Sequence, residues 1–226
     1  MIKNYDDFCT ELLLAGFSLA SGGNDEGVFA LLKDNADCDC VRWHTGDAET
    51  DPWEWRIRVL DERSDIAYGK FFFRKSGYIT KQWFPYFLSA RRGDASVDDL
   101  YDDGKISTLA KGIYDVIRDH GAIPVHEIKH ICGCAKEDKG RFDRALTDLQ
   151  SGMFITTCGR RQKISVSGSE YGWASAMYCT AEMFWGGDVF DAAARITKAD
   201  AESAIKAQIY KLNPNADAKK ISKFIY

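Results

Sequence analysis

Proline is scarce in this sequence, at 4 of 226 residues, and no apolar run approaches the roughly 18 residues that a membrane-spanning helix needs. With a hydrophobic fraction of 45%, the scarcity of proline argues against long disordered segments and indicates a sizeable buried core. The first residues do not combine a basic segment, an apolar stretch and a cleavage site, so we expect no secretory signal. We therefore predict a compact cytoplasmic protein without membrane association.

Signatures of common enzyme sites are also missing. The chain contains no G-x-S-x-G nucleophile motif, no P-loop and no glycine pattern for a dinucleotide.

Its seven cysteines are an odd number and cannot all pair within the chain, and free thiols are the usual state in the cytosol. We therefore expect reduced cysteines and no cofactor. Nothing in the sequence defines an oligomeric state.

Two groups of thiol and imidazole side chains resemble halves of a zinc site. The first comprises Cys38, Cys40 and His44, and the second comprises His126, His130, Cys132 and Cys134. However, C-x-C spacing is less typical of zinc sites than C-x-x-C, and free cysteine is often simply buried. We expect no metal, and a single zinc shared by both groups is the alternative.

The charge of the chain is unevenly distributed. A net charge of -4 argues against a strong nonspecific binder of polyanions. Residues 106–168, however, contain ten Lys and Arg against seven Asp and Glu, while the rest of the chain contains 20 against 27. A basic excess is therefore confined to the middle of the chain.

Residues 1–105 are expected to form an N-terminal α+β lobe. The pattern over 5–16 predicts an amphipathic helix that ends at Gly16, whereas 53–62 fits either a helix or a strand. Residues 67–80 predict a hairpin that turns at Ser76 and Gly77, which suggests a degenerate winged-helix module. We expect Thr80 to cap a short helix whose middle is limited by Pro85.

Residues 106–170 have the element order of a winged helix-turn-helix. A helix capped by Ser107 is followed by a short strand at Ile123, a second helix at 125–133 and a third helix up to Gly152. The next residues predict strand, turn and strand, with the turn at 159–162. We assign 171–226 to a C-terminal helical extension, with two helices separated at Asn213 and Pro214. The predicted fold is α+β, mainly helical, with winged helix-turn-helix modules and small β-hairpin wings.

Basic residues concentrate where a winged helix contacts DNA, on its third helix and on its wing. They are Lys136, Lys139, Arg141 and Arg144 on the helix and Arg160, Arg161 and Lys163 at the expected wing tip. Such side chains form charge-assisted contacts with phosphates and release counterions. Acidic neighbours on the same helix favour the alternative, a protein-docking module. We weigh DNA above docking because the basic residues occupy both contact points.

The sequence offers few candidates for catalytic side chains. His44 and Asp51 lie in one acidic stretch and are the candidates for acid or base catalysis. A solvated acidic loop is the commoner explanation, because no nucleophile or phosphate-binding glycine loop accompanies them. Tryptophans such as Trp53 and Trp173 could stack on unpaired bases, although most are expected in the core.

Two stretches resemble the AlkZ-related proteins, relatives of the bacterial tandem winged-helix DNA glycosylases AlkZ and YcaQ. They are DPWEWRIRVLDERSDIAYGKFFFRKSGYITKQWFPYF and GRFDRALTDLQSGMFITTCG, within about residues 50–165. The resemblance implies winged-helix modules around DNA, hydrolysis of an N-glycosidic bond without a metal, and a role in DNA repair. The Gln-x-Gln or Gln-x-Asp pair of these glycosylases is absent from the N-terminal half, where Gln82 is isolated, and their His-x-Pro motif is missing.

We therefore predict a DNA-binding winged-helix protein related to the AlkZ glycosylases but without their glutamine site. The first alternative is a diverged glycosylase for alkylated or crosslinked bases that uses His44 or a nearby acid. The second is a protein-docking scaffold.

Overall fold

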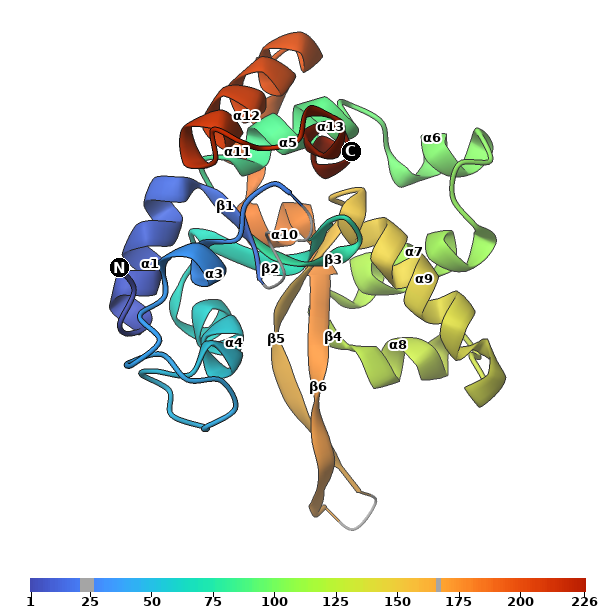
Figure 1. The fold of residues 1–226 in the computed structure, drawn as a ribbon. Coiled ribbons are helices and arrows are strands. Elements are labelled where there is room, and N and C mark those ends of the chain that lie inside the picture. Colours follow the sequence, from blue (N-terminus) through green and yellow to red (C-terminus); the bar gives the residue numbers. More distant parts are fainter. Residues whose placement is uncertain (21–26, 166–167) are drawn as a thin grey trace. The chain divides into compact units, whose positions relative to one another are not determined.

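The computed structural model describes residues 1–20, 27–165 and 168–226, which form two compact units (Figure 1). Unit 1 comprises Met1–Asp94 and Gly187–Tyr226, and unit 2 comprises Ala95–Gly186. Unit 2 thus contains the expected winged-helix region and continues to Gly186. The division into three functional parts stays a prediction.

Unit 1 combines three antiparallel strands with helices from both ends of the chain. Its elements are α1 (Tyr5–Ala15), β1 (Phe17–Leu19), α3 (Leu31–Asn35), α4 (Pro52–Glu62), β2 (Ile66–Phe72), β3 (Lys75–Thr80), α5 (Phe84–Arg91), α11 (Gly187–Ala194), α12 (Lys198–Leu212) and α13 (Ala218–Ile225). In the sheet, β3 pairs antiparallel with β1 on one side and with β2 on the other.

Aromatic side chains form the core of unit 1. Trp55 of α4 packs on Phe8 of α1 with ring centroids 5.2 Å apart, and Phe72 of β2 stacks on Phe224 of α13 at 4.2 Å. Large aromatic rings bury much apolar area and gain from such ring pairs. The segment 53–62, ambiguous in sequence, is therefore a helix whose inner face is fixed by Trp55.

The predicted hairpin in unit 1 exists, but its turn lies elsewhere. Phe73 and Arg74, with φ of 51° and 61°, form the connection between β2 and β3. Gly77 lies within β3, where an added Cβ would stand 2.6 Å from Phe72 and 2.7 Å from the Ser18 carbonyl oxygen. This glycine allows close packing inside the sheet instead of a turn.

Helix ends in unit 1 follow local signals in most cases. α1 ends at Gly16 as predicted, and Asn213 and Pro214 separate α12 from α13. Thr80 does not cap α5, because it is the last residue of β3 and the residue directly before α5 is Trp83. α5 begins later, with Pro85 in its first turn, where a missing N–H costs nothing.

Unit 2 combines three antiparallel strands with helices. Its elements are α6 (Val97–Asp102), α7 (Thr108–His120), β4 (Ile123–Pro124), α8 (Val125–Ile131), the 3-10 helix η1 (Lys136–Asp138), α9 (Lys139–Ser151), β5 (Ile155–Ile164), β6 (Glu170–Thr180) and α10 (Ala181–Trp185). β6 pairs antiparallel with both β5 and β4. Ile113, Ile117, Ile128, Phe142 and Leu149 are central in the core that joins α7, α8 and α9.

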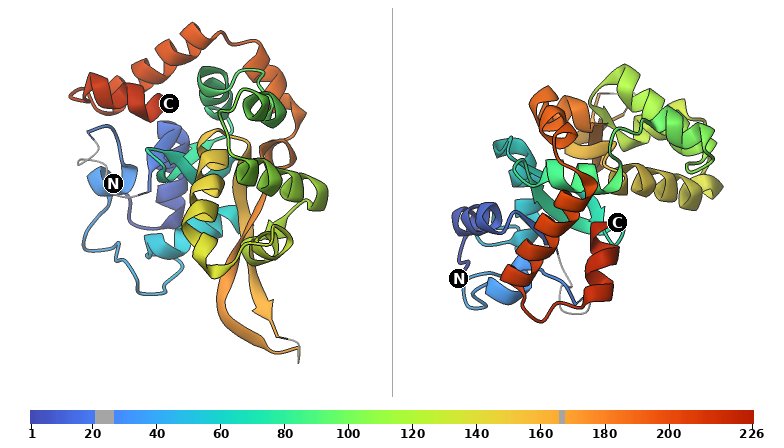
Figure 2. Two further views of the ribbon diagram at one scale, coloured as in Figure 1. Left: turned by 90° about the vertical axis from the view of Figure 1, so that its right-hand side faces the viewer. Right: turned by 90° about the horizontal axis from the view of Figure 1, so that it is seen from above.

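The hairpin of unit 2 is longer than its sequence suggests. Residues 159–162, predicted as the turn, lie inside β5, and the chain reverses only after Ile164. The segment from Glu170 is β6, so it is not part of a helical extension. The two strands run past the ends of the helices of unit 2 (Figures 1 and 2).

None of the helices in the described ranges is long and apolar enough to cross a membrane. All seven cysteines are free thiols.

Gly16 and Gly46 give a matched test of backbone packing in unit 1. Both have positive φ, at 89° and 77°, but a Cβ on Gly16 would stand 2.1 Å from Trp83, whereas Gly46 has nothing within 4 Å. We predict that Gly16→Ala lowers the free energy of unfolding by about 3 kcal/mol, because backbone strain and overpacking add. Gly46→Ala should cost about 1 kcal/mol from strain alone. Urea unfolding measures both, and equal losses would contradict the close contact with Trp83.

Candidate nucleic-acid interface

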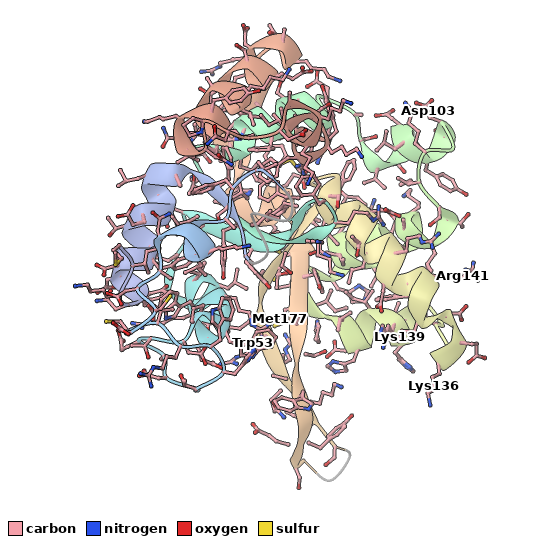
Figure 3. The ribbon with its side chains drawn as sticks, viewed as in Figure 1. Trp53, Asp103, Lys136, Lys139, Arg141 and Met177 are labelled. Atoms are coloured by element: carbon pink, nitrogen blue, oxygen red, sulfur yellow. The ribbon has the colours of Figure 1, made fainter. Side chains whose placement is uncertain are left out.

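α9 presents one apolar and one basic face. Phe142, Ala145 and Leu149 recur at helical spacing and are buried against α7 and α8. The remaining face carries exposed Lys139, Arg141 and Arg144. Lys136, Lys139 and Arg141, labelled in Figure 3, project from η1 and the start of α9. Because the apolar face is fixed in the core, the basic face is held toward solvent.

The charges on α9 are only partly compensated. Arg141 lies 3.4 Å from Asp138, yet its side chain is 78% exposed. Lys129 of α8 lies 3.8 Å from Asp143. Ion pairs this exposed contribute little to stability and exchange readily with other anions. The basic side chains can therefore turn toward phosphate groups.

A hollow of about 890 Å³ adjoins this basic face. Arg141 and Arg144 line it from α9, and Ser107 and Thr108 line it from the start of α7. Asp148 lies on the same wall, so the hollow is not uniformly positive. The basic face is thus a mixed surface that carries both basic and acidic side chains.

The three basic residues expected at the wing tip lie instead along β5. Arg160 pairs with Ala176 and Arg161 with Ser175, so neither stands at the turn. Arg161 is half-exposed and lies 3.5 Å from Glu127 of α8, which ties the hairpin to that helix. Lys163 pairs with Tyr171 nearer the end of the hairpin. The basic residues of the hairpin therefore follow its length.

Sequence reasoning missed most of the exposed apolar residues of the hairpin. Trp173 is 91% exposed, Ile164 65% and Tyr171 53%. Gly172, with a φ of 63°, lies inside β6 and disturbs the regular alternation of side chains around Trp173. Trp55 and Trp185, in contrast, are buried as expected for core tryptophans. One signal in the sequence could have indicated these residues. Tyr171 and Trp173 follow shortly after Lys163, which lies on a predicted strand, and aromatic and basic side chains together are typical of a binding surface.

The two catalytic candidates lie in one loop of unit 1, where Asp51 has a structural task. Its buried carboxylate accepts four backbone N–H bonds, from His44, Thr45, Gly46 and Trp53, at 2.7–3.0 Å. Burial alone would raise the pKa of Asp51, but these N–H groups together hold it below its usual value. This geometry indicates that Asp51 holds the loop together and caps α4. It argues against a role of Asp51 in proton transfer.

His44 stands at the exposed end of the same loop. Its φ of 62° is unusual for a residue other than glycine, and the bond from its N–H to Asp51 holds that conformation. Its ring lies 4.9 Å from that of Trp53, which is 43% exposed, and the Arg56 guanidinium covers Trp53 at 3.5 Å. The loop thus presents an imidazole next to an indole already paired with a cation.

The zinc alternative finds no support in the geometry. Within residues 1–20, 27–165 and 168–226, no three His, Cys, Asp or Glu side chains gather as a metal site would require. Burial raises the pKa of the Cys132 and Cys134 thiols, so both favour the protonated form.

These features describe an α+β protein of two units, one of which presents a basic helix beside a long β-hairpin. The chain belongs to the AlkZ-related family, whose model matches residues 2–226. The resemblance predicted from about residues 50–165 is confirmed and extends through both units. The family suggests a relationship with DNA glycosylases. No curated protein and no solved structure matches the chain.

Asp51 provides a prediction about stability and pH. Asp51→Ala should lower the free energy of unfolding by about 3 kcal/mol at pH 7, because buried N–H groups lose their acceptor and α4 loses its cap. The folded-state pKa of Asp51 is depressed, so its contribution exists above the unfolded pKa of about 3.9 and disappears as pH falls through the folded pKa. The loss should therefore shrink in urea unfolding below about pH 4.

Asp61→Ala, on the exposed side of the same helix, is the control and should change stability by less than about 0.5 kcal/mol. A loss at Asp51 that does not vary with pH would contradict the carboxylate clamp.

Proposed function

We propose that unit 2 is a winged helix-turn-helix module and that the protein binds DNA through it. The order α7, β4, α8, α9, β5, β6 supports this proposal, since it is the order of three helices and a wing in such modules. The pairing supports it as well, because the short strand β4 joins the outer edge of the hairpin strand β6.

The observation that carries the proposal is the basic face of α9. In this fold the third helix enters the major groove, and its N-terminal residues lie nearest the bases. Lys139, Arg141 and Arg144 occupy the first two turns of α9, and all three are exposed. We assign them to the groove, and Lys136 to a phosphate beside it.

The hairpin supplies the second group of contacts. Arg160, Arg161 and Lys163 are spread along β5, a distribution that suits successive phosphates better than one base. Each neutralised phosphate releases counterions and steepens the dependence of affinity on salt. Because unit 2 also carries acidic residues such as Asp138 and Asp148, we expect moderate affinity that is strongly sensitive to salt.

A fluorescence titration of duplex DNA at several salt concentrations tests the proposal. We predict that the triple variant Lys139→Ala, Arg141→Ala, Arg144→Ala lowers affinity at least about ten-fold and reduces the slope of log K against log salt by about 0.9 for each phosphate that is no longer neutralised. The hairpin variant Arg160→Ala, Arg161→Ala, Lys163→Ala should reduce the slope similarly.

The matched control removes three exposed lysines of unit 1, Lys206, Lys211 and Lys219, and so changes the net charge equally. It should leave the slope nearly unchanged. If the control weakens binding as much as the α9 variant, the interaction is general electrostatic attraction. If wild-type protein binds no duplex at any salt, the docking function becomes the better explanation.

A second candidate function is base excision by a diverged glycosylase. Family membership favours it, together with the strained His44 beside the exposed ring of Trp53, because strained residues cluster at functional sites. In this case His44 acts as the acid or base, and Asp51 positions it through the loop. Release of free base from alkylated or crosslinked DNA, abolished in His44→Ala, is the expected result. Intact substrate at high protein concentration would remove this candidate.

A further inference from the structure

The outer part of the unit 2 hairpin contains a long bulge. Arg161 pairs with Ser175 and Lys163 with Tyr171, so the single residue Gln162 faces three residues of β6, numbers 172–174. The Gln162 side-chain amide donates to the carbonyl oxygens of Tyr171 and Gly172, at 3.2 and 2.9 Å. Gly172 adopts the positive φ that such an irregularity needs. The bulge is therefore fixed by side-chain hydrogen bonds.

The bulge determines how Trp173 is presented. In a regular strand its indole would lie over cross-strand neighbours, but here the ring is 91% exposed. Tyr171 of the same strand is also largely exposed, so folding leaves more than one aromatic side chain of the outer hairpin uncovered. Large apolar side chains that folding leaves exposed can mark binding sites.

The charges around Trp173 indicate the chemistry of its ligand. Between Ile155 and Thr180 the hairpin carries three basic residues and one acidic residue, Glu170. An indole next to cations on the same hairpin suits a polyanion that also offers flat aromatic rings. A nucleic acid with unstacked bases combines both properties.

We propose that Trp173 stacks on an unpaired base, so that the protein prefers DNA interrupted by an unpaired nucleotide over a continuous duplex. This inference rests on the proposed DNA-binding function and specifies its target. In a continuous duplex the bases are stacked on each other, and the indole gains only sugar and phosphate contacts. At an unpaired nucleotide the base is already free, and the hairpin inserts Trp173 without breaking a base pair.

The experiment uses the full chain and two DNA probes of the same sequence. One is a continuous duplex, and the other carries a single bulged 2-aminopurine. We expect wild-type protein to bind the bulged probe about ten-fold more tightly, which corresponds to the free energy of stacking one base on an aromatic side chain. Binding should also quench the fluorescence of the 2-aminopurine. Trp173→Ala should abolish the preference and the quenching but keep the affinity for the duplex. Trp173→Phe should retain part of both.

Leu14→Ala is the control for the loss of an exposed apolar side chain, since Leu14 is 70% exposed and lies on α1, outside the hairpin. It should behave like wild type. Because the Trp173 indole is almost fully exposed, its removal should leave the unfolding transition unchanged.

The outcomes separate the two proposals. Equal affinity of wild-type protein for both probes, or a preference that survives in Trp173→Ala, overturns the stacking inference and leaves DNA binding in place. Absence of binding to both probes overturns both proposals.

Discussion

The pairing of β6 on both of its edges is the constraint on which the candidate interface depends. At Tyr178 the strand is bonded to β5 through Thr157 and to β4 through Ile123, next to the helical core of unit 2. This double pairing fixes the base of the hairpin relative to α8 and α9, while the outer half has no such support from β4. β6 thus connects the helical core of unit 2 with the exposed outer half of the hairpin. The basic residues of β5 keep a defined register against β6.

Most helices of this protein were predictable because their signals are local. Ser107 accepts from the N–H of Ala110, and Gly121 ends α7, as the sequence alone suggests. The order of helices and strands in unit 2 was also predictable for this reason. Both hairpin turns were placed wrongly because glycine was interpreted as a turn residue. Gly77 and Gly159 lie inside strands, and for Gly77 the reason is close packing with Phe72 and Ser18, which are remote contacts that no local pattern reveals.

The candidate site was predictable in its charges but not in its geometry. Lys139, Arg141 and Arg144 were identified by helical spacing, and their exposure agrees with that interpretation. The role of Asp51 was not predictable, because a carboxylate that accepts four backbone bonds looks in sequence like any other acid of an acidic stretch. The exposure of Trp173 depends on a bulge created by two strands, and neither strand shows it alone.

The bulge opposite Gln162 also affects how readily the long hairpin can associate with the hairpin of another molecule of this protein. A flat strand edge offers a row of N–H and C=O groups to which any other strand can add, and this is a common route to aggregation. At residues 172–174 the regular ladder is broken, and the carbonyl oxygens of Tyr171 and Gly172 are already occupied by the Gln162 amide. The irregularity that exposes the Trp173 indole thus also makes this part of the strand a poorer template for pairing with a strand of another molecule.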